Sequence, residues 1–221
     1  MIDDILSYIA PHHCCGCGKI GGLLCGNCKY NIINESENAC IVCHQPTSLL
    51  CLCNTCKMPY EKAWYVGRRE DVLQQLIDVY KFKQARSAYR DLAELLSQTL
   101  PDLPKDTVIV PIPTISSHIR ARGYDHMLLI AKHLARKRGL RCQSALYRKT
   151  NTKQRQASAS QRIAQAEKTF GVRSVVKPDV PYLVLDDVYT TGATVKYASK
   201  VLLEAGAKCV WVAVIARQIL D

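Results

Sequence analysis

An acidic pair followed by a run of small hydroxyl side chains lies at residues 183–194. Residues 183–185 lack polar alternation, which is typical of a parallel strand buried on both faces. Asp186 and Asp187 come next, and open α/β sheets place their ligands at the carboxyl ends of such strands. The loop that follows is small enough for backbone N–H groups to close around an anion, and it consists of Thr190, Thr191, Gly192, Ala193 and Thr194.

Residues 195–205 predict a helix that ends at Gly206, so the loop opens onto a helix N-terminus. A helix N-terminus preceded by a hydroxyl-rich loop is suited to a phosphate group. Two carboxylates beside it favour hydroxyl groups over a second phosphate. A phosphate next to vicinal hydroxyls describes a ribose 5-phosphate, which is the ligand that this segment predicts. The alternative is an ordinary strand–turn–helix with a chance acidic pair.

The segment resembles the phosphoribosyl-diphosphate (PRPP) motif of type I phosphoribosyltransferases, in which an apolar run and two acids precede Thr-Thr-Gly-x-Thr. The resemblance implies that Asp186 and Asp187 are the acids of the catalytic site and that they hold the ribose hydroxyls. It assigns the 5-phosphate to residues 190–194.

Ten of the twelve cysteines fall between residues 14 and 56, and eight of them form four C-x2-C pairs. Two such pairs make a tetrahedral four-thiolate site, so the four pairs predict two structural zinc ions. Metal would supply folding energy to a segment that is too short and too poor in large apolar residues for a core of its own. The predicted ligands are Cys14, Cys17, Cys25, Cys28, Cys40, Cys43, Cys53 and Cys56.

The pairing of these cysteines stays open at this stage. Sequential pairing, 14/17 with 25/28 and 40/43 with 53/56, needs only short loops, and a cross-brace is the other arrangement. Cys15 and Cys51 are left over, and His44 is a candidate substitute ligand. A redox role is the competing interpretation, but no thioredoxin-like surround accompanies the pairs.

A second strand with a ligand loop is predicted earlier in the chain. Residues 108–110 predict a short buried strand, and a loop with a basic rim and then a helix follow it. In phosphoribosyltransferases a loop after an earlier strand holds the diphosphate. That resemblance assigns Thr114, Arg120 and Arg122 to diphosphate binding, with the arginines as charge partners. Arginines that only aid solubility are the alternative.

The net charge of +11 is distributed unevenly: residues 1–60 carry three Lys against four acids, and residues 61–221 carry +12. Within residues 132–173, twelve Lys and Arg stand against Glu167 alone. Such a block favours a polyanion, either a diphosphate or a nucleic-acid backbone, over a merely solvated helix face. The candidate contacts to single-stranded DNA are Lys149, Lys153, Gln154, Arg155 and Arg162.

Over nearly its whole length the chain resembles the ComF family (ComFC/GntX type), in which a zinc-finger module is fused to a phosphoribosyltransferase domain. The motifs that carry the resemblance are the cysteine pairs, the PRPP-like segment, Tyr80-Lys-Phe-Lys83, Val110-Pro-Ile-Pro113 and Arg120-Ala-Arg-Gly123. Gln154, Arg162 and Phe170 resemble residues of the family's flexible loop. The chain reads Arg122-Gly-Tyr-Asp-His126 where the family favours Arg-Gly-Phe-Asn-Gln, and it has Gln165 in place of an asparagine.

The resemblance implies a protein of DNA uptake in natural transformation, which binds PRPP or ribose-5-phosphate groups and handles incoming single-stranded DNA. The implied partners are a PRPP-type ligand, single-stranded DNA and a helicase-like competence ATPase, and the implied cofactors are two zinc ions and Mg²⁺ with PRPP. The alternative is an active Mg-dependent phosphoribosyltransferase of nucleotide metabolism with an unknown acceptor. The sequence shows no apolar run as long as a membrane span and no basic start, so we expect a cytoplasmic protein that works at the inner face of the membrane.

We therefore expect an α/β fold in two parts. Residues 61–221 should form a parallel sheet of the type I phosphoribosyltransferase type, covered by helices. Residues 1–60 should form a small zinc-binding module with two four-cysteine sites.

Overall fold

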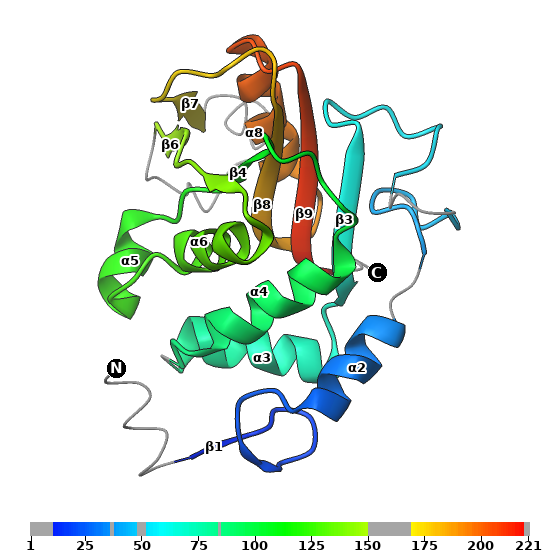
Figure 1. The fold of residues 1–221 in the computed structure, drawn as a ribbon, viewed down its shortest axis with the longest axis vertical. Coiled ribbons are helices and arrows are strands. Elements are labelled where there is room, and N and C mark those ends of the chain that lie inside the picture. Colours follow the sequence, from blue (N-terminus) through cyan, green and yellow to red (C-terminus); the bar gives the residue numbers. More distant parts are fainter. Residues whose placement is uncertain (1–10, 36–37, 48–51, 84, 150–168, 219–221) are drawn as a thin grey trace, which may run out of the picture.

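A sheet of five parallel strands lies at the centre of the computed structural model, which describes residues 11–35, 38–47, 52–83, 85–149 and 169–218 (Figure 1). The strand order is β3–β9–β8–β4–β5, so the expected parallel α/β sheet is confirmed. The bounds are β3 Lys62–Arg68, β4 Val108–Pro111, β5 Arg141–Cys142, β8 Pro181–Tyr189 and β9 Cys209–Arg217.

The two central strands, β8 and β9, are apolar along most of their length because both of their faces are buried. Alternate side chains enter separate hydrophobic clusters: Leu183 and Leu185 belong to one, and Tyr182 and Val184 to the other. The sheet therefore separates two cores, one on each face.

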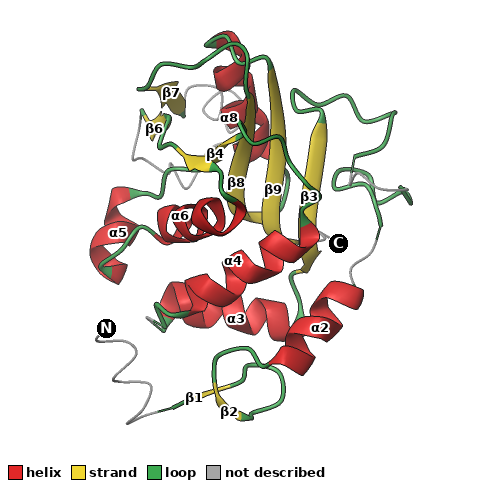
Figure 2. Cartoon of the chain, in the orientation of Figure 1, coloured by secondary structure: helices red, strands yellow, loops and turns green. Residues whose placement is uncertain are grey.

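Helices cover both faces of the sheet (Figure 2). One core is closed by three helices, α3 (Asp71–Phe82), α4 (Ala88–Thr99) and α6 (His126–Arg138). The other is closed by α8 (Ala193–Glu204), beside the short antiparallel pair β6 (Leu146–Arg148) and β7 (Phe170–Val172). This two-sided cover leaves the strand ends as the places where polar groups can gather.

The cysteine-rich segment packs against both faces rather than against one. Its first part contains β1 (His12–His13), β2 (Ile20–Gly21) and α2 (Gly26–Asn34), and its buried residues Leu23 and Leu24 join the core under α3 and α4. Lys29 Nζ also lies 3.5 Å from Asp91 Oδ1 on α4. Its second part places Ile41 and Tyr60, both at most 1% exposed, in the core under α8.

The segment expected to be a basic loop after β4 contains a short helix, α5 (Ser116–Arg122). The helix ends at Gly123, whose φ of 79° is a left-handed conformation that glycine adopts without strain. Arg120 and Arg122 lie in its last turn, where the unpaired carbonyls favour cations. The arginines are thus carried by a helix that the sequence pattern did not indicate.

Candidate functional site

The acidic pair lies near the carboxyl end of β8, which continues through Val188 and Tyr189. Asp186 is opposite Val214 of β9 in the ladder and is 9% exposed, whereas the side chain of Asp187 is 16% exposed. Two neighbouring carboxylates with so little access to water cannot both be ionised cheaply. The two carboxylates accordingly have different hydrogen-bond partners and pKa values shifted in opposite directions.

Asp187 is the ionised member of the pair. Its Oδ2 atom lies 2.7 Å from Lys81 Nζ and 2.7 Å from His126 Nε2. Burial on its own would raise the pKa of Asp187, but the His126 hydrogen bond and the Lys81 charge outweigh it and hold that pKa below its usual range. Asp187 therefore stays charged at neutral pH.

Asp186 has lost most of its solvent without gaining such partners. Burial, and after it the charge of Asp187, raises the pKa of Asp186 to about 7. Its Oδ1 atom accepts the backbone N–H of Asp187 at 2.9 Å, and the Arg148 guanidinium favours its ionised form more weakly. The pair thus offers one fixed carboxylate and one that titrates near neutral pH.

His126 links the acidic pair to the segment after β4. Its Nδ1 atom lies 3.0 Å from a terminal nitrogen of Arg122 and 3.1 Å from Thr114 Oγ1, which donates to Asp125 at 2.8 Å. Because a guanidinium can only donate, Nδ1 accepts, and Nε2 is the nitrogen that donates to Asp187. Arg122 is thereby joined to Asp187 through one imidazole, and the Thr114 hydroxyl lies beside that ring.

Two tyrosines hydrogen-bond to the main chain at and beside Lys81 and His126. The Tyr80 hydroxyl donates to the carbonyl of His126 at 2.8 Å, and the Tyr124 hydroxyl donates to the carbonyl of Tyr80 at 2.6 Å. Arg122 Nε also donates to the carbonyl of Lys81 at 2.9 Å. These hydrogen bonds therefore connect the end of α3, which carries Lys81, to the start of α6, which carries His126.

A small hollow beside Asp186 is lined by the loop that was predicted to hold phosphate. Its walls are Asp186, Val188, Tyr189, Thr190, Gly192, Thr194 and Val195. Gly192 precedes α8 with φ of 72°, and a Cβ built on it would lie 2.2 Å from the Tyr189 hydroxyl oxygen. Both the backbone conformation and the adjacent ring thus require glycine here. The first N–H groups of α8 open at this hollow, as an anion site needs.

The structure brings most of the predicted residues together, but not all. Asp186, Asp187, Thr114, Arg122 and residues 190–194 surround one edge of the sheet, whereas Arg120 is exposed on α5. Lys149 lies just after β6, and its N–H donates to the carbonyl of Thr169. Lys153, Gln154, Arg155 and Arg162 lie outside the described residues.

Three site residues were not assigned a role from the sequence. Lys81 and His126 contact Asp187 directly, and Arg148 donates to the carbonyl of Pro113 at 2.8 Å beside the acidic pair. Lys81 stood in the Tyr80–Lys83 motif, and His126 was visible as the residue that replaces a family glutamine. Arg148 was one cation among twelve, with no signal to distinguish it.

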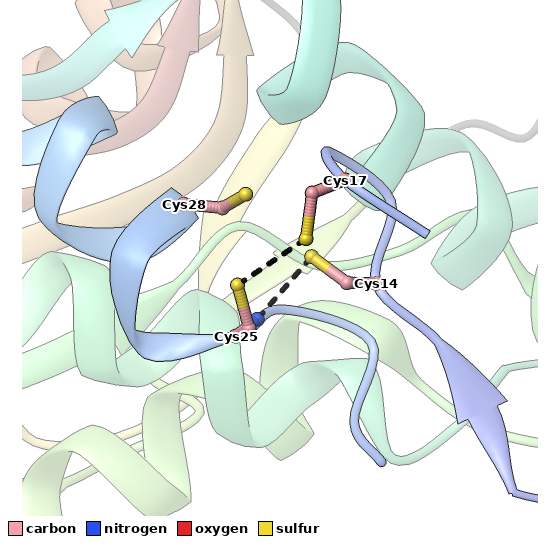
Figure 3. A group of neighbouring side chains, drawn as sticks. All are labelled: Cys14, Cys17, Cys25 and Cys28. Carbon is pink, nitrogen blue, oxygen red and sulfur yellow. Dashed lines mark hydrogen bonds between the residues drawn. The ribbon is translucent and has the colours of Figure 1, made fainter. Parts of the chain in front are cut away.

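The cysteines form two groups of four, each in the sequential pairing (Figure 3). In the first group, Cys14 and Cys17 on the loop after β1 face Cys25 and Cys28 at the start of α2, and the four sulfur atoms lie within 4.8 Å of one another. The Cys17 and Cys25 sulfurs are 3.6 Å apart, close to the roughly 3.8 Å expected of two ligands on a tetrahedral zinc with Zn–S bonds near 2.3 Å. The group has the spacing that a zinc ion requires.

The second group repeats the first. Cys43 Sγ lies 3.5 Å from Cys53 Sγ, and the Cys53 N–H donates to Cys40 Sγ at 3.3 Å, just as the Cys25 N–H donates to Cys14 Sγ at 3.3 Å. Cys56 completes the group. Both groups could therefore hold zinc in the same way, with N–H donors that favour a thiolate.

His44 occupies a backbone position in this repeat rather than a ligand position. It follows Cys43 with φ of 67°, as Gly18 follows Cys17 with φ of 73°. Each of the two residues donates its N–H to the carbonyl of the first cysteine in its group. The left-over Cys15 packs against the core under α4, and Cys51 lies outside the described residues.

A parallel sheet with an acidic pair and a glycine loop at its carboxyl edge, joined to two four-thiol clusters, matches what the resemblance to the ComF family implies for this chain. The resemblance to that family is confirmed by curated relatives, although no family model matches the chain. Competence protein ComFC of Bacillus subtilis (strain 168) is 25% identical over 201 residues, which is 83% of this chain and 79% of that protein.

Two further relatives extend the comparison. Competence protein ComFC of Streptococcus pneumoniae (strain ATCC BAA-255 / R6) is 27% identical over 84% of this chain and 83% of that protein. Competence protein F of Haemophilus influenzae (strain ATCC 51907 / DSM 11121 / KW20 / Rd) is 26% identical over 87% of this chain and 96% of that protein. The similarity thus spans most of both chains in each case.

Solved structures are more distant. The allosteric regulatory enzyme of purine biosynthesis has a TM-score of 0.42 at 22% identity, over 58% of this chain and 25% of that one. A hypoxanthine phosphoribosyltransferase from Staphylococcus aureus has a TM-score of 0.37 at 12% identity, over 63% of this chain and 74% of that one. The fold assignment accordingly stands on the strand order and the two buried faces of the sheet. None of the helices among the described residues has the length and apolar character that crossing a bilayer demands.

Replacing His44 tests whether it is a zinc ligand. We expect His44→Gly to retain two zinc ions per chain. Its free energy of unfolding should equal that of the wild type or exceed it by up to about 1 kcal/mol, because glycine adopts a left-handed backbone conformation without strain. Cys43→Ser should lose one zinc ion. Metal analysis of the purified variants measures both, and loss of one zinc ion from His44→Gly would show that the imidazole coordinates.

The raised pKa of Asp186 predicts a pH-dependent gain in stability for Asp186→Asn. The folded state favours the protonated acid, so wild-type stability from this group is full below about pH 4 and is lost as the pH rises to about 7. Asparagine cannot ionise, so the variant does not lose this stability. The difference in free energy of unfolding between the variant and the wild type should grow with pH, to at most roughly 4 kcal/mol.

Urea unfolding between pH 5.5 and 8.5 measures this difference. Asp187→Asn is the matched control, and it should be destabilised across the same range because the fold stabilises the charged form of Asp187. An Asp186→Asn advantage that is the same at both pH limits would contradict the assignment.

Proposed function

We propose that this chain is a ComF-type protein of DNA uptake whose sheet-edge site binds the phosphoribosyl group of PRPP, and which handles incoming single-stranded DNA at the inner face of the membrane. The observation that carries the proposal is the hollow in which Asp186 and the loop at residues 190–194 share one wall. The names of the three relatives, all competence proteins, support the biological setting.

The proposed ligand divides between the two kinds of group in the site. Backbone N–H groups and hydroxyls of residues 190–194 would hold the 5-phosphate at the start of α8. The charged carboxylate of Asp187 would accept hydrogen bonds from the ribose hydroxyls, which are worth more than bonds between neutral partners.

The segment after β4 suits a more highly charged group. The Lys81 ammonium contacts Asp187, Arg122 donates to the carbonyl of Lys81, and the Thr114 hydroxyl donates to Asp125. Such a set would offset the charge of a diphosphate. The ionised Asp187 is an oxygen donor that Mg²⁺ accepts, and bound Mg²⁺ would neutralise diphosphate oxygens.

The proposal for DNA rests on charge and on position. Arg148 and Lys149 belong to the basic stretch at residues 132–173, and they lie at the end of β6 beside the site. The 5-phosphate of a DNA strand would offer the loop the same group as a ribose 5-phosphate, although the deoxyribose lacks the vicinal hydroxyls that the acidic pair would hold. The lysines and arginines that follow would bind the next phosphates.

Titration with ribose 5-phosphate tests the sugar-phosphate site. We expect calorimetry to detect binding to the wild type and a loss of affinity of about 10-fold or more in Asp187→Asn, because a charged hydrogen bond is worth about 1.5–3 kcal/mol. Asp179→Asn, which neutralises an exposed acid in a turn, is the control and should bind like the wild type.

Equal affinity in Asp186→Asn, Asp187→Asn and the wild type would overturn the site. The same titration with Mg-PRPP and a panel of nucleobases tests the alternative, an active transferase, through the release of diphosphate.

Neutralising the basic stretch tests the DNA proposal. The test variant changes Lys149, Lys153, Arg155 and Arg162 to Ala. We expect its affinity to depend less steeply on salt, with the slope of log affinity against log salt smaller in magnitude by up to about 3, since each phosphate contact on a single strand contributes about 0.7. Fluorescence anisotropy with a labelled oligonucleotide measures this slope. The matched control changes four exposed lysines to Ala elsewhere, at Lys19, Lys105, Lys200 and Lys208. An equal effect of both sets would reduce the interaction to net charge alone.

A further inference from the structure

Two buried tyrosines join the second cysteine group to the phosphate loop. The hydroxyls of Tyr60 and Tyr189 lie 3.3 Å apart, and the two residues are 1% and 4% exposed. They are 129 positions apart in the chain. Tyr60 follows the last ligand of the second group, Cys56, by four residues, and Tyr189 ends β8 directly before the loop.

Tyr189 sets the shape of the loop by occupying the space above Gly192. The positions nearest to a Cβ at Gly192 are three atoms of the Tyr189 ring and hydroxyl, at 2.2–2.7 Å. Gly192 is also the residue with left-handed φ that starts α8. A shift of this ring would therefore release the backbone that turns the N–H groups of α8 towards the hollow.

Tyr60 is held on its other side by the second cysteine group. Ile41, between Cys40 and Cys43, is fully buried and shares a hydrophobic cluster with Tyr60, Tyr189 and Val195. Burial raises the pKa of Tyr60, and the neighbouring phenol of Tyr189 raises it further. One hydrophobic cluster and one hydroxyl contact thus connect the segment between Cys40 and Cys43 to the tyrosine above the loop.

The first cysteine group lacks this route. Its buried neighbours, Leu23 and Leu24, belong to the core on the opposite face of the sheet, with α3 and α4. Gly16 faces Cys28 and Val72 there. The two groups share a set of four thiols and an N–H to sulfur hydrogen bond, and they differ in the core that each one packs against.

We propose that the second cysteine group, when it holds its metal, positions the phosphate loop through Tyr60 and Tyr189, so that metal binding there and sugar-phosphate binding at residues 190–194 favour each other. The inference rests on the proposed function of that loop. Tyr60 and Tyr189 act as positioning residues. Loss of metal would free the segment around Ile41, then the Tyr60 ring, and then the Tyr189 ring above Gly192. Linkage makes the effect reciprocal, since a ligand that orders the loop must also slow metal loss.

The experiment follows thiol alkylation by N-ethylmaleimide in the presence of a zinc chelator, with each cysteine read separately by peptide mass spectrometry. The first group serves as a control within the same molecule. The first arm of the experiment needs no ligand. Gly192→Ala, which would push on the Tyr189 ring, should raise the alkylation rate about fivefold at the second group and leave the first group unchanged.

A double-mutant cycle then shows whether the ring carries the effect. In a Tyr189→Leu background the clash is gone, and Gly192→Ala should add no further increase at the second group. The strain of alanine at a left-handed φ is common to both backgrounds and cancels in the cycle. An effect of Gly192→Ala on both groups alike, or on neither, would overturn the inference.

The second arm uses the wild-type chain and therefore does not depend on the folding of any variant. Saturating ribose 5-phosphate should slow alkylation at the second group about fivefold and leave the first unchanged. Binding by calorimetry without this selective protection would overturn the inference and leave the proposed function standing. Absence of binding would overturn the proposed function, and the first arm would still decide whether the thiols and the loop are coupled.

Discussion

Burial of β8 on both faces leaves its two consecutive carboxylates in surroundings that cannot hydrate two charges. The charge on Asp187 is retained because Lys81 and His126 reach it from the end of α3 and the start of α6, while Asp186 retains a proton to about pH 7. This need for partners requires two helices to converge on one strand end. The tyrosine hydrogen bonds between those helices, and the position of Arg122 against Lys81, follow from the same convergence.

The elements that sequence reasoning predicted well are those whose signal is local. The apolar run of β8, the helix that follows the loop at residues 190–194 and the spacing of the cysteines are each indicated by residues close together in the chain. The partners of Asp187 are 61 and 106 positions away from it, and a lysine or histidine in a helix has no sequence feature that says which strand it will meet. The helix at residues 116–122 was missed because it is short and its neighbours include Pro111 and Pro113, which indicate a loop.

The cysteine-rich segment places two similar four-thiol groups in unlike surroundings. The thiol geometry is repeated almost atom for atom, with a left-handed residue after the second cysteine of each group. The surroundings are not repeated, since one group abuts the helices over one face of the sheet and the other abuts the strand end beside α8. A metal site takes its importance to the rest of a protein from the core it packs into, and not from its ligands alone.

The contacts of Asp187 also bear on which molecules the site admits. Lys81 and His126 both contact Oδ2, which fixes the carboxylate in one orientation before any ligand arrives. In the proposed site, a free sugar would gain only the contacts at Asp187, and inorganic phosphate would gain only those at the loop. A ligand that presents both groups together would gain both sets of contacts for a single loss of translational and rotational freedom. Such a site would discriminate against free sugars and inorganic phosphate without any surface built to reject them.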